Sequence, residues 1–243
     1  MIKSARDHSA ALLLRWDVDV QSAMRIQQRL RHRLSFNDGF AFRNIRWVAG
    51  ADVAYATAGD AIFGAVVVLN FPQLSVAEEI QVKRQIKFPY IPGLLSFREA
   101  PVLIEAFAML QRRPDVILFD GQGIAHPRGF GLASHLGLLL GIPSVGCAKT
   151  RLVGDHDPVA RSRGSFSWLL LEGRKVGAVV RTRADVKPVF VSPGDKISLR
   201  TAVRLVLTTC GSYRLPEPIR RAHQLSNRSR NRERGCADSG VKL

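Results

Sequence analysis

The chain has 243 residues and a formal net charge of +16, from 36 Lys and Arg against 20 Asp and Glu, and 46% of its residues are hydrophobic. This length suits one α/β domain, and no apolar run reaches the ~18 residues of a membrane span, so we expect a soluble protein. The three cysteines form no CxxC pair, which argues against a disulfide framework or a zinc ribbon and fits a reducing cytoplasm.

The first half of the chain predicts one helix and three strands. A loose apolar stripe with Asp17 or Asp19 near its start predicts an amphipathic helix over 17–34, packed on the main domain. Three strand-like runs follow, over 45–55, 61–71 and 75–86. Because Asn70-Phe71-Pro72-Gln73 is short enough for a hairpin turn, these runs should form an antiparallel meander.

The second half predicts alternating helices and strands. Helical spacing of apolar residues predicts a helix over 99–111, whereas the continuous apolar run 115–120 is typical of a buried strand that pairs parallel to a neighbour. The later elements are a helix over 130–140, strands over 144–148, 165–171, 176–182 and 188–192, a helix over 198–209, and a last helix opened by Pro218. The pattern indicates an α/β fold whose mixed sheet has three meandering antiparallel strands followed by parallel strands, flanked by helices.

These elements are expected to form a single domain over 1–227. Beyond Asn227 the chain is polar and Arg-rich, so we expect residues 228–243 to be a disordered basic tail. The net positive charge attracts polyanions, of which nucleic acid is the commonest, although a basic protein without such a partner is the alternative.

Two aspartates occupy positions typical of an active site. Asp52 lies inside an otherwise apolar strand, where an unpaired charge is costly. Asp120 ends the buried central strand, at the sheet edge where α/β folds build their sites. Asp52 could instead pair with an arginine, and Asp120 could be a capping or turn residue.

Glu99 is the third candidate carboxylate. Ser96 to Glu99 matches a capping box, in which Glu99 would only satisfy a backbone amide. Pro101 argues against that assignment, because it would fall inside the helix and break a hydrogen bond. We therefore expect the helix to start later and to leave Glu99 near its N-terminus, free to act as a ligand.

Three carboxylates at one sheet edge form a hard oxygen site suited to Mg²⁺ or Mn²⁺. In a chain this basic, the chemistry that such a site favours is phosphodiester hydrolysis.

Four segments carry a resemblance to a known family. They are VAGAD (48–52), FPYIPGLLSFRE (88–99), DVILFDGQGIAHPR (115–128) and CAKTRL (147–152). In order and spacing they resemble the signature blocks of endonuclease V, over about Trp47 to His223. The resemblance implies a ribonuclease H-like fold and magnesium-dependent cleavage, with Mn²⁺ able to substitute, at the second phosphodiester bond 3′ to a deoxyinosine. The segments before Asp19 and after Asn227 have no block to match.

The resemblance also implies roles for individual residues. Asp52, Glu99 and Asp120 match the metal-binding carboxylates, His223 matches the position that completes the site, and Lys149 matches a lysine near the scissile phosphate. From the residues alone, His223 could be a structural hydrogen bonder and Lys149 a solvated lysine at a strand end.

The implied substrate-binding residues are Pro89, Tyr90, Ile91, Gly121, Gln122, Gly123 and His126. Tyr90 matches a wedge that enters the duplex, Gly121 and Gly123 match a turn whose amides approach the extruded base, and His126 matches a histidine beside the site. From the residues alone, Tyr90 could be an aromatic ring that covers the core, and Gly121 and Gly123 could form only a sharp strand-to-helix turn.

Three functions remain to be separated. The first is a monomeric repair enzyme that acts on DNA with deoxyinosine or other deaminated bases. The second is a nuclease for inosine-containing RNA or for deformed duplexes. The third is a non-catalytic nucleic-acid-binding module of the same fold, which would be expected to lack one or more of the carboxylates.

Overall fold

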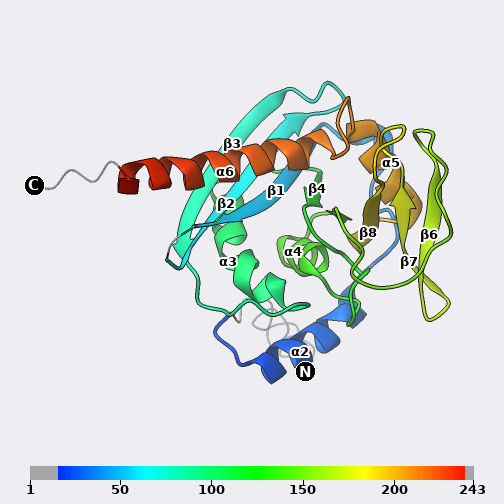
Figure 1. The fold of residues 1–243 in the computed structure, drawn as a ribbon. Coiled ribbons are helices and arrows are strands. Elements are labelled where there is room, and N and C mark those ends of the chain that lie inside the picture. The colour runs from blue at the N-terminus through cyan, green and yellow to red at the C-terminus, as the bar shows by residue number, and fades with distance from the viewer. Residues whose placement is uncertain (1–15, 58, 239–243) are drawn as a thin grey trace, which may run out of the picture.

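The computed structural model describes residues 16–57 and 59–238, and its strands form one mixed sheet in the order β3-β2-β1-β4-β5-β8-β7-β6 (Figure 1). The strands are β1 (Trp47–Tyr55), β2 (Ala61–Asn70), β3 (Val76–Gln85), β4 (Val116–Phe119), β5 (Ser144–Ala148), β6 (Phe166–Leu171), β7 (Arg174–Val180) and β8 (Val189–Asp195). The predicted meander is confirmed, because β1, β2 and β3 pair antiparallel. The predicted parallel pairing is also confirmed, because β4 lies parallel to both β1 and β5.

Helices cover both faces of the sheet (Figure 1). The described helices are α2 (Val20–Leu30), α3 (Leu95–Ala108), α4 (Leu132–Leu140), α5 (Leu199–Thr209) and α6 (Glu217–Asp238), with short 3-10 turns at Arg31–Arg33 and Phe42–Asn44. The expected N-terminal helix is confirmed in α2, which Asp19 caps by accepting a hydrogen bond from the Ser22 amide at 2.7 Å. None of the described helices is both long and apolar enough to cross a membrane.

The buried strands divide their side chains between two layers of core. In β4, Val116 and Leu118 join the layer that contains α5, whereas Ile117 and Phe119 join the layer that contains α3 and α4. This alternation follows from the two-residue repeat of a strand, and it explains why a strand buried on both faces is continuously apolar. A third cluster packs α2 onto the chain around Phe88 and Phe130.

Helix α3 differs from its prediction. It begins at Leu95 rather than at residue 99, ends at Ala108, and contains Pro101. Pro101 removes one helical hydrogen bond, but neighbouring helix residues such as Phe97 and Leu103 are buried in the core. Packing therefore outweighs the local preference that suggested a later start.

The chain end also differs from its prediction. Helix α6 continues to Asp238, so residues 228–238 are helical where the sequence indicated a disordered tail. The segment has one glycine and no proline, and it extends a helix whose first turns pack on β1 and β2. A helix that is already nucleated by packing propagates at little cost. Residues 239–243 of the expected tail, and residues 1–15 of the expected domain, lie outside the described residues.

Candidate active site

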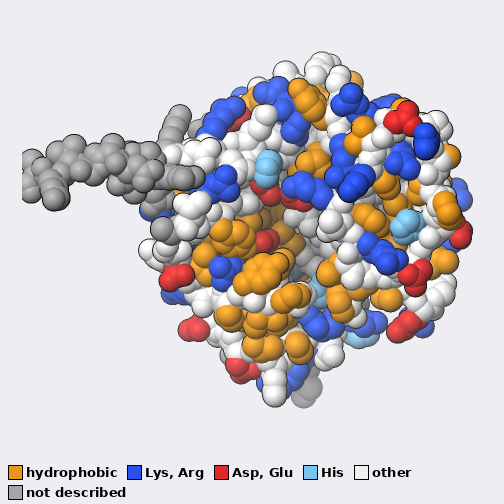
Figure 2. Space-filling view, in the orientation of Figure 1, with side chains coloured by type: hydrophobic (Ala, Val, Ile, Leu, Met, Phe, Trp, Pro, Cys, Tyr) orange, Lys and Arg blue, Asp and Glu red, His pale blue; other side chains and the backbone are white. Residues whose placement is uncertain are grey.

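The candidate site lies at the sheet edge where β1 and β4 end. These strands are parallel and Ala51 is in register with Phe119, so the next residues, Asp52 and Asp120, lie side by side. Helix α6 crosses the sheet over β1 and adds His223. One possible ligand atom from each of Asp52, Asp120 and His223 lies within 4.8 Å of the others. Figure 2 shows acidic side chains in a hollow of the surface, with a histidine and basic side chains beside them.

Asp52 is held from the α6 side. It is 8% exposed, and its Oδ2 lies 2.9 Å from His223 Nδ1 and accepts a hydrogen bond from Ser226 Oγ at 3.1 Å. The hydrogen bond to Asp52 raises the pKa of His223 above its ordinary value, which favours the imidazolium next to the carboxylate. Asp52 therefore pairs with a histidine and a serine of α6, and the arginine partner considered from the sequence is not the one observed.

Asp120 faces Lys149. Lys149 follows β5 directly, and its Nζ donates a hydrogen bond to Asp120 Oδ2. Burial and the neighbouring Asp52 charge raise the pKa of Asp120, while Lys149 and His223 oppose that rise. Asp120 is thus an acid at the sheet edge and belongs to a charged cluster.

Glu99 approaches the same place from α3 but points its carboxylate at a tyrosine. Tyr55 donates a hydrogen bond to Glu99 Oε1 at 2.7 Å, and Arg98 lies over the Tyr55 ring. Burial, followed by repulsion from Asp52 and Asp120, raises the pKa of Glu99 to about 7. Glu99 lies within the early turns of α3, as the corrected helix bounds require, rather than before it. Tyr55 was missed from the sequence, because nothing local distinguishes it from another strand aromatic.

The charges of the cluster fit a bound cation. Asp52 and Asp120 share this cluster with His223, whereas Glu99 is not among the described residues whose ligand atoms lie within 4.8 Å of one another. The negative charge of Asp52 nevertheless raises the pKa of both Glu99 and Asp120. Oxygen donors of this kind suit a hard divalent cation better than a soft one.

A cavity of about 360 Å³ opens beside the carboxylates, within the range of about 300–1,000 Å³ typical of small-ligand sites. The predicted site residues that line it are Tyr90, Glu99, Asp120, Gly121, Gln122, His126 and Lys149. Pro89 and Ile91 flank Tyr90 without lining the cavity, and Tyr90 itself is 64% exposed. That exposure does not fit an aromatic ring that covers the core.

Gly123 and His126 have interior partners. The Gly123 amide donates to Ser192 Oγ at 2.8 Å, and a Cβ at Gly123 would lie 1.9 Å from the Pro193 carbonyl oxygen. His126 is 3% exposed, and burial lowers its pKa to about 4, so the imidazole is neutral. Gly123 therefore packs the turn against β8, which leaves Gly121 as the glycine of this turn that lines the cavity.

Comparison with known proteins identifies the family. The family model described as Endonuclease V matches residues 28–224 of the chain. The chain belongs to the endonuclease V family. An endonuclease V from Nostoc sp. is 50% identical over 212 residues, which are 87% of this chain and 96% of the relative. The match spans nearly the whole of that relative.

Solved structures of endonuclease V agree with the fold. The protein from Streptomyces avermitilis superposes with a TM-score of 0.86 at 39% identity, covering 90% of this chain and 96% of the other. An endonuclease V from Ciona intestinalis, in complex with DNA containing an inosine followed by a ribo-adenosine, gives a TM-score of 0.75 at 27% identity over 85% and 95% of the two chains. The ribonuclease H-like fold expected from the resemblance is thereby confirmed.

Proposed function

We propose that this endonuclease V is a DNA repair enzyme that recognises deoxyinosine and hydrolyses the second phosphodiester bond 3′ to it, with Mg²⁺ as cofactor and Mn²⁺ as a substitute. The observation that carries the proposal is the cluster of Asp52, Asp120 and His223 next to a base-sized cavity. A monomer in the cytoplasm is part of the proposal, supported by two free and buried cysteines, Cys147 and Cys210.

The acidic side chains have distinct tasks in this proposal. Asp52, Asp120 and Glu99 would hold the metal, which would supply Lewis acidity toward the phosphate and lower the pKa of a bound water. Lys149, already hydrogen-bonded to Asp120, places a positive charge where negative charge develops on the phosphate. Ser226 and His223 hold the Asp52 carboxylate in one orientation.

Recognition takes place in the adjoining cavity. An extruded base would lie against Gly121, where the absence of a side chain lets backbone approach it closely. Gln122 lines the same cavity, and its Nε2 donates to the Thr150 carbonyl at 3.2 Å.

Cleavage of matched oligonucleotides tests the proposed function. We expect a nick near deoxyinosine in duplex DNA, no nick in the same duplex with deoxyadenosine, and dependence on added Mg²⁺ or Mn²⁺. An RNA oligonucleotide with inosine at the same position separates the two substrate classes, because only RNA carries the 2′-hydroxyl. Faster cleavage of the RNA would show that inosine-containing RNA is the main substrate. No cleavage of either oligonucleotide would favour the non-catalytic nucleic-acid-binding module.

The exposed ring of Tyr90 predicts a difference between substrates. Tyr90→Ala should lower kcat/KM about tenfold or more on duplex DNA and much less on single-stranded DNA, because only a duplex has a few kcal/mol of pairing and stacking to overcome. Kinetics on both substrates, with the melting temperature of each variant, measure this. Phe36→Ala removes another exposed aromatic side chain that does not line the cavity and serves as control. Equal losses on both substrates with a lower melting temperature would mean that Tyr90 only packs.

The basic end of α6 predicts salt-dependent binding that is independent of the lesion. Arg220 and Arg221 already pair with Glu217, so the contribution should come from Arg228, Arg230 and the residues beyond. Truncation after Asn227 should flatten the plot of log K against log salt by about 0.9 for each phosphate that the shortened protein no longer neutralises. The double variant Arg228→Gln, Arg230→Gln removes charge without shortening the helix. An unchanged slope in both would show that this end does not touch DNA.

A further inference from the structure

The carbonyl oxygen of Gly93 accepts hydrogen bonds from three side chains. Gln27 Nε2 donates to it at 3.0 Å, His126 Nε2 at 2.9 Å and Arg128 Nη2 at 2.6 Å. A carbonyl oxygen has two lone pairs, so three donors leave it fully occupied. Gly93 has a φ of +80°, and a Cβ there would lie 2.8 Å from Arg128 Nη2. The positive φ therefore favours glycine at this position.

The donors are themselves fixed by hydrogen bonds. Gln27 is 1% exposed; its second Nε2 hydrogen goes to the Phe130 carbonyl at 3.1 Å, and its Oε1 accepts from Arg128 Nε at 2.5 Å. His126 is neutral, with Nδ1 accepting from the Arg128 amide at 3.2 Å, so its Nε2 carries the hydrogen that Gly93 accepts. The amide of Gln27 thus has each of its polar atoms paired, which determines its orientation.

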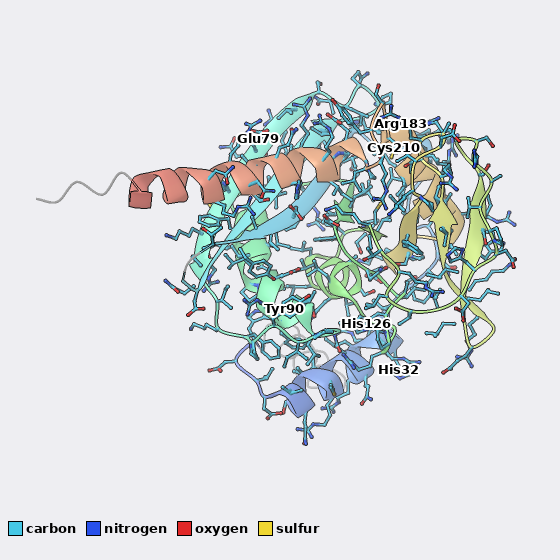
Figure 3. All side chains as sticks on the ribbon, viewed as in Figure 1. His32, Glu79, Tyr90, His126, Arg183 and Cys210 are labelled. Carbon is cyan, nitrogen blue, oxygen red and sulfur yellow. The ribbon has the colours of Figure 1, made fainter. Side chains whose placement is uncertain are left out.

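This network joins three segments that are far apart in the chain. Gln27 belongs to α2, Gly93 ends the loop that carries Tyr90, and His126 and Arg128 belong to the turn that follows Gly121. Figure 3 places Tyr90 and His126 on the side of the molecule next to α2. Gln27, Tyr90, Gly93 and His126 all line the cavity beside the carboxylates. The Tyr90 loop is therefore tied both to α2 and to the turn that forms the cavity wall.

We propose that Gln27 is a positioning residue for lesion recognition, which holds the Tyr90 loop in register with the base cavity through the Gly93 carbonyl. The inference rests on the proposed function and adds a role for the N-terminal helix. A wedge separates bases only if its distance from the cavity is held constant while the duplex opens, because the opened base must enter the cavity as the ring takes its place. Gln27 is the side chain of α2 that bonds to both the Tyr90 loop and the turn.

The variant Gln27→Met tests the proposal, because it retains an unbranched side chain of similar length and removes all three hydrogen bonds. Gln28→Met is the matched control, since Gln28 is the next residue of α2 and is exposed. We expect Gln27→Met to lower kcat/KM on duplex DNA with deoxyinosine about tenfold more than on the single strand, which corresponds to about 1.4 kcal/mol. Gln28→Met should leave both values unchanged.

A binding measurement separates positioning from loss of structure. The fluorescence of 2-aminopurine opposite the deoxyinosine, measured without divalent metal, reports opening of the duplex before cleavage. Gln27→Met should weaken that signal, as Tyr90→Ala should. Equal losses on duplex and single strand, or an unchanged signal, would overturn the inference while leaving the proposed function intact, provided the unaltered enzyme cleaves both substrates.

If Gln27→Met does not fold, Arg128→Met decides the question by the same two measurements. Arg128 is partly exposed and contributes two of the bonds to Gln27 and Gly93. A loss of kcat/KM confined to duplex DNA would support the positioning role of this network, and an equal loss on duplex and single-stranded DNA would reject it.

Discussion

Replacing Asp120 by alanine should abolish cleavage while leaving the protein folded. The carboxylate lies in the acidic cluster and is hydrogen-bonded to Lys149, so its removal takes away both a proposed metal ligand and the partner of that lysine. Because a bound metal supplies several kcal/mol of transition-state stabilisation, and each ~1.4 kcal/mol is tenfold in rate, we expect a loss on the order of 10³-fold or more. Asp52→Ala should behave in the same way.

The fold should tolerate this change because Asp120 is a partly buried charge. Burial and repulsion from Asp52 raise its pKa, which means that the ionised form is disfavoured in the folded protein. Removing a charge whose ionised form is disfavoured in the folded state need not destabilise a protein. Single-turnover cleavage with saturating enzyme, together with the melting temperature, measures both effects.

Asp155→Asn serves as the matched control, since the Asp155 side chain is almost fully exposed and pairs with Arg151 in the loop that follows β5. Binding of the lesion should persist in Asp120→Ala, because much of the affinity for DNA comes from phosphate contacts elsewhere. Undiminished single-turnover cleavage by Asp120→Ala would refute the assigned site.

Gly50→Ala should damage both stability and activity. A Cβ at Gly50 would lie 2.0 Å from the Pro218 carbonyl oxygen, where β1 and α6 touch through their backbones. Neither backbone can turn away as a side chain can, so the helix must move off the strand. Overpacking of this kind costs about 1–3 kcal/mol or more. For a chain of this size that corresponds to a melting temperature lower by about 2–4 °C for each kcal/mol.

The displacement should reach the active site, because α6 carries His223 and Ser226 to Asp52. Cleavage should therefore fall by more than the decrease in folded protein explains. Gly211→Ala is the control, since Gly211 lies in the loop between α5 and α6 and a Cβ there meets nothing within 4 Å. An unchanged melting temperature in Gly50→Ala would show that strand and helix do not approach each other as closely as described.

Much of the fold could be predicted from the sequence, because its elements follow from local periodicity. The buried strand before Asp120 was evident as a continuous apolar run, and the hairpin between β2 and β3 from its turn residues. The start of α3 could not be predicted, because the cost of an internal proline applies to an isolated helix, whereas Pro101 lies in a helix that the core supports. The end of α6 could not be predicted either, because polar composition does not reveal a helix already nucleated by packing upstream.

The candidate site, too, could be predicted from local sequence pattern only in part. Asp52 and Asp120 stood out in the sequence because a charge in or at the end of an apolar strand is conspicuous wherever the strand lies. Their closeness follows from the parallel pairing of β1 with β4; the sequence indicated a parallel neighbour for β4 but not which strand it is. His223 and Lys149 came from resemblance to the family, since a single histidine or lysine has no local signature.

By itself the sequence determined that Asp52 lies in a strand and that Asp120 ends one, and it determined the basic character of the protein and its family. Only the tertiary structure decided which side chains meet. Tyr55 bonds to Glu99 across 44 positions, His223 to Asp52 across 171, and Gln27 to Gly93 across 66. Such contacts depend on the packing of whole helices against the sheet. A periodic pattern within one segment does not indicate which other segment it will contact.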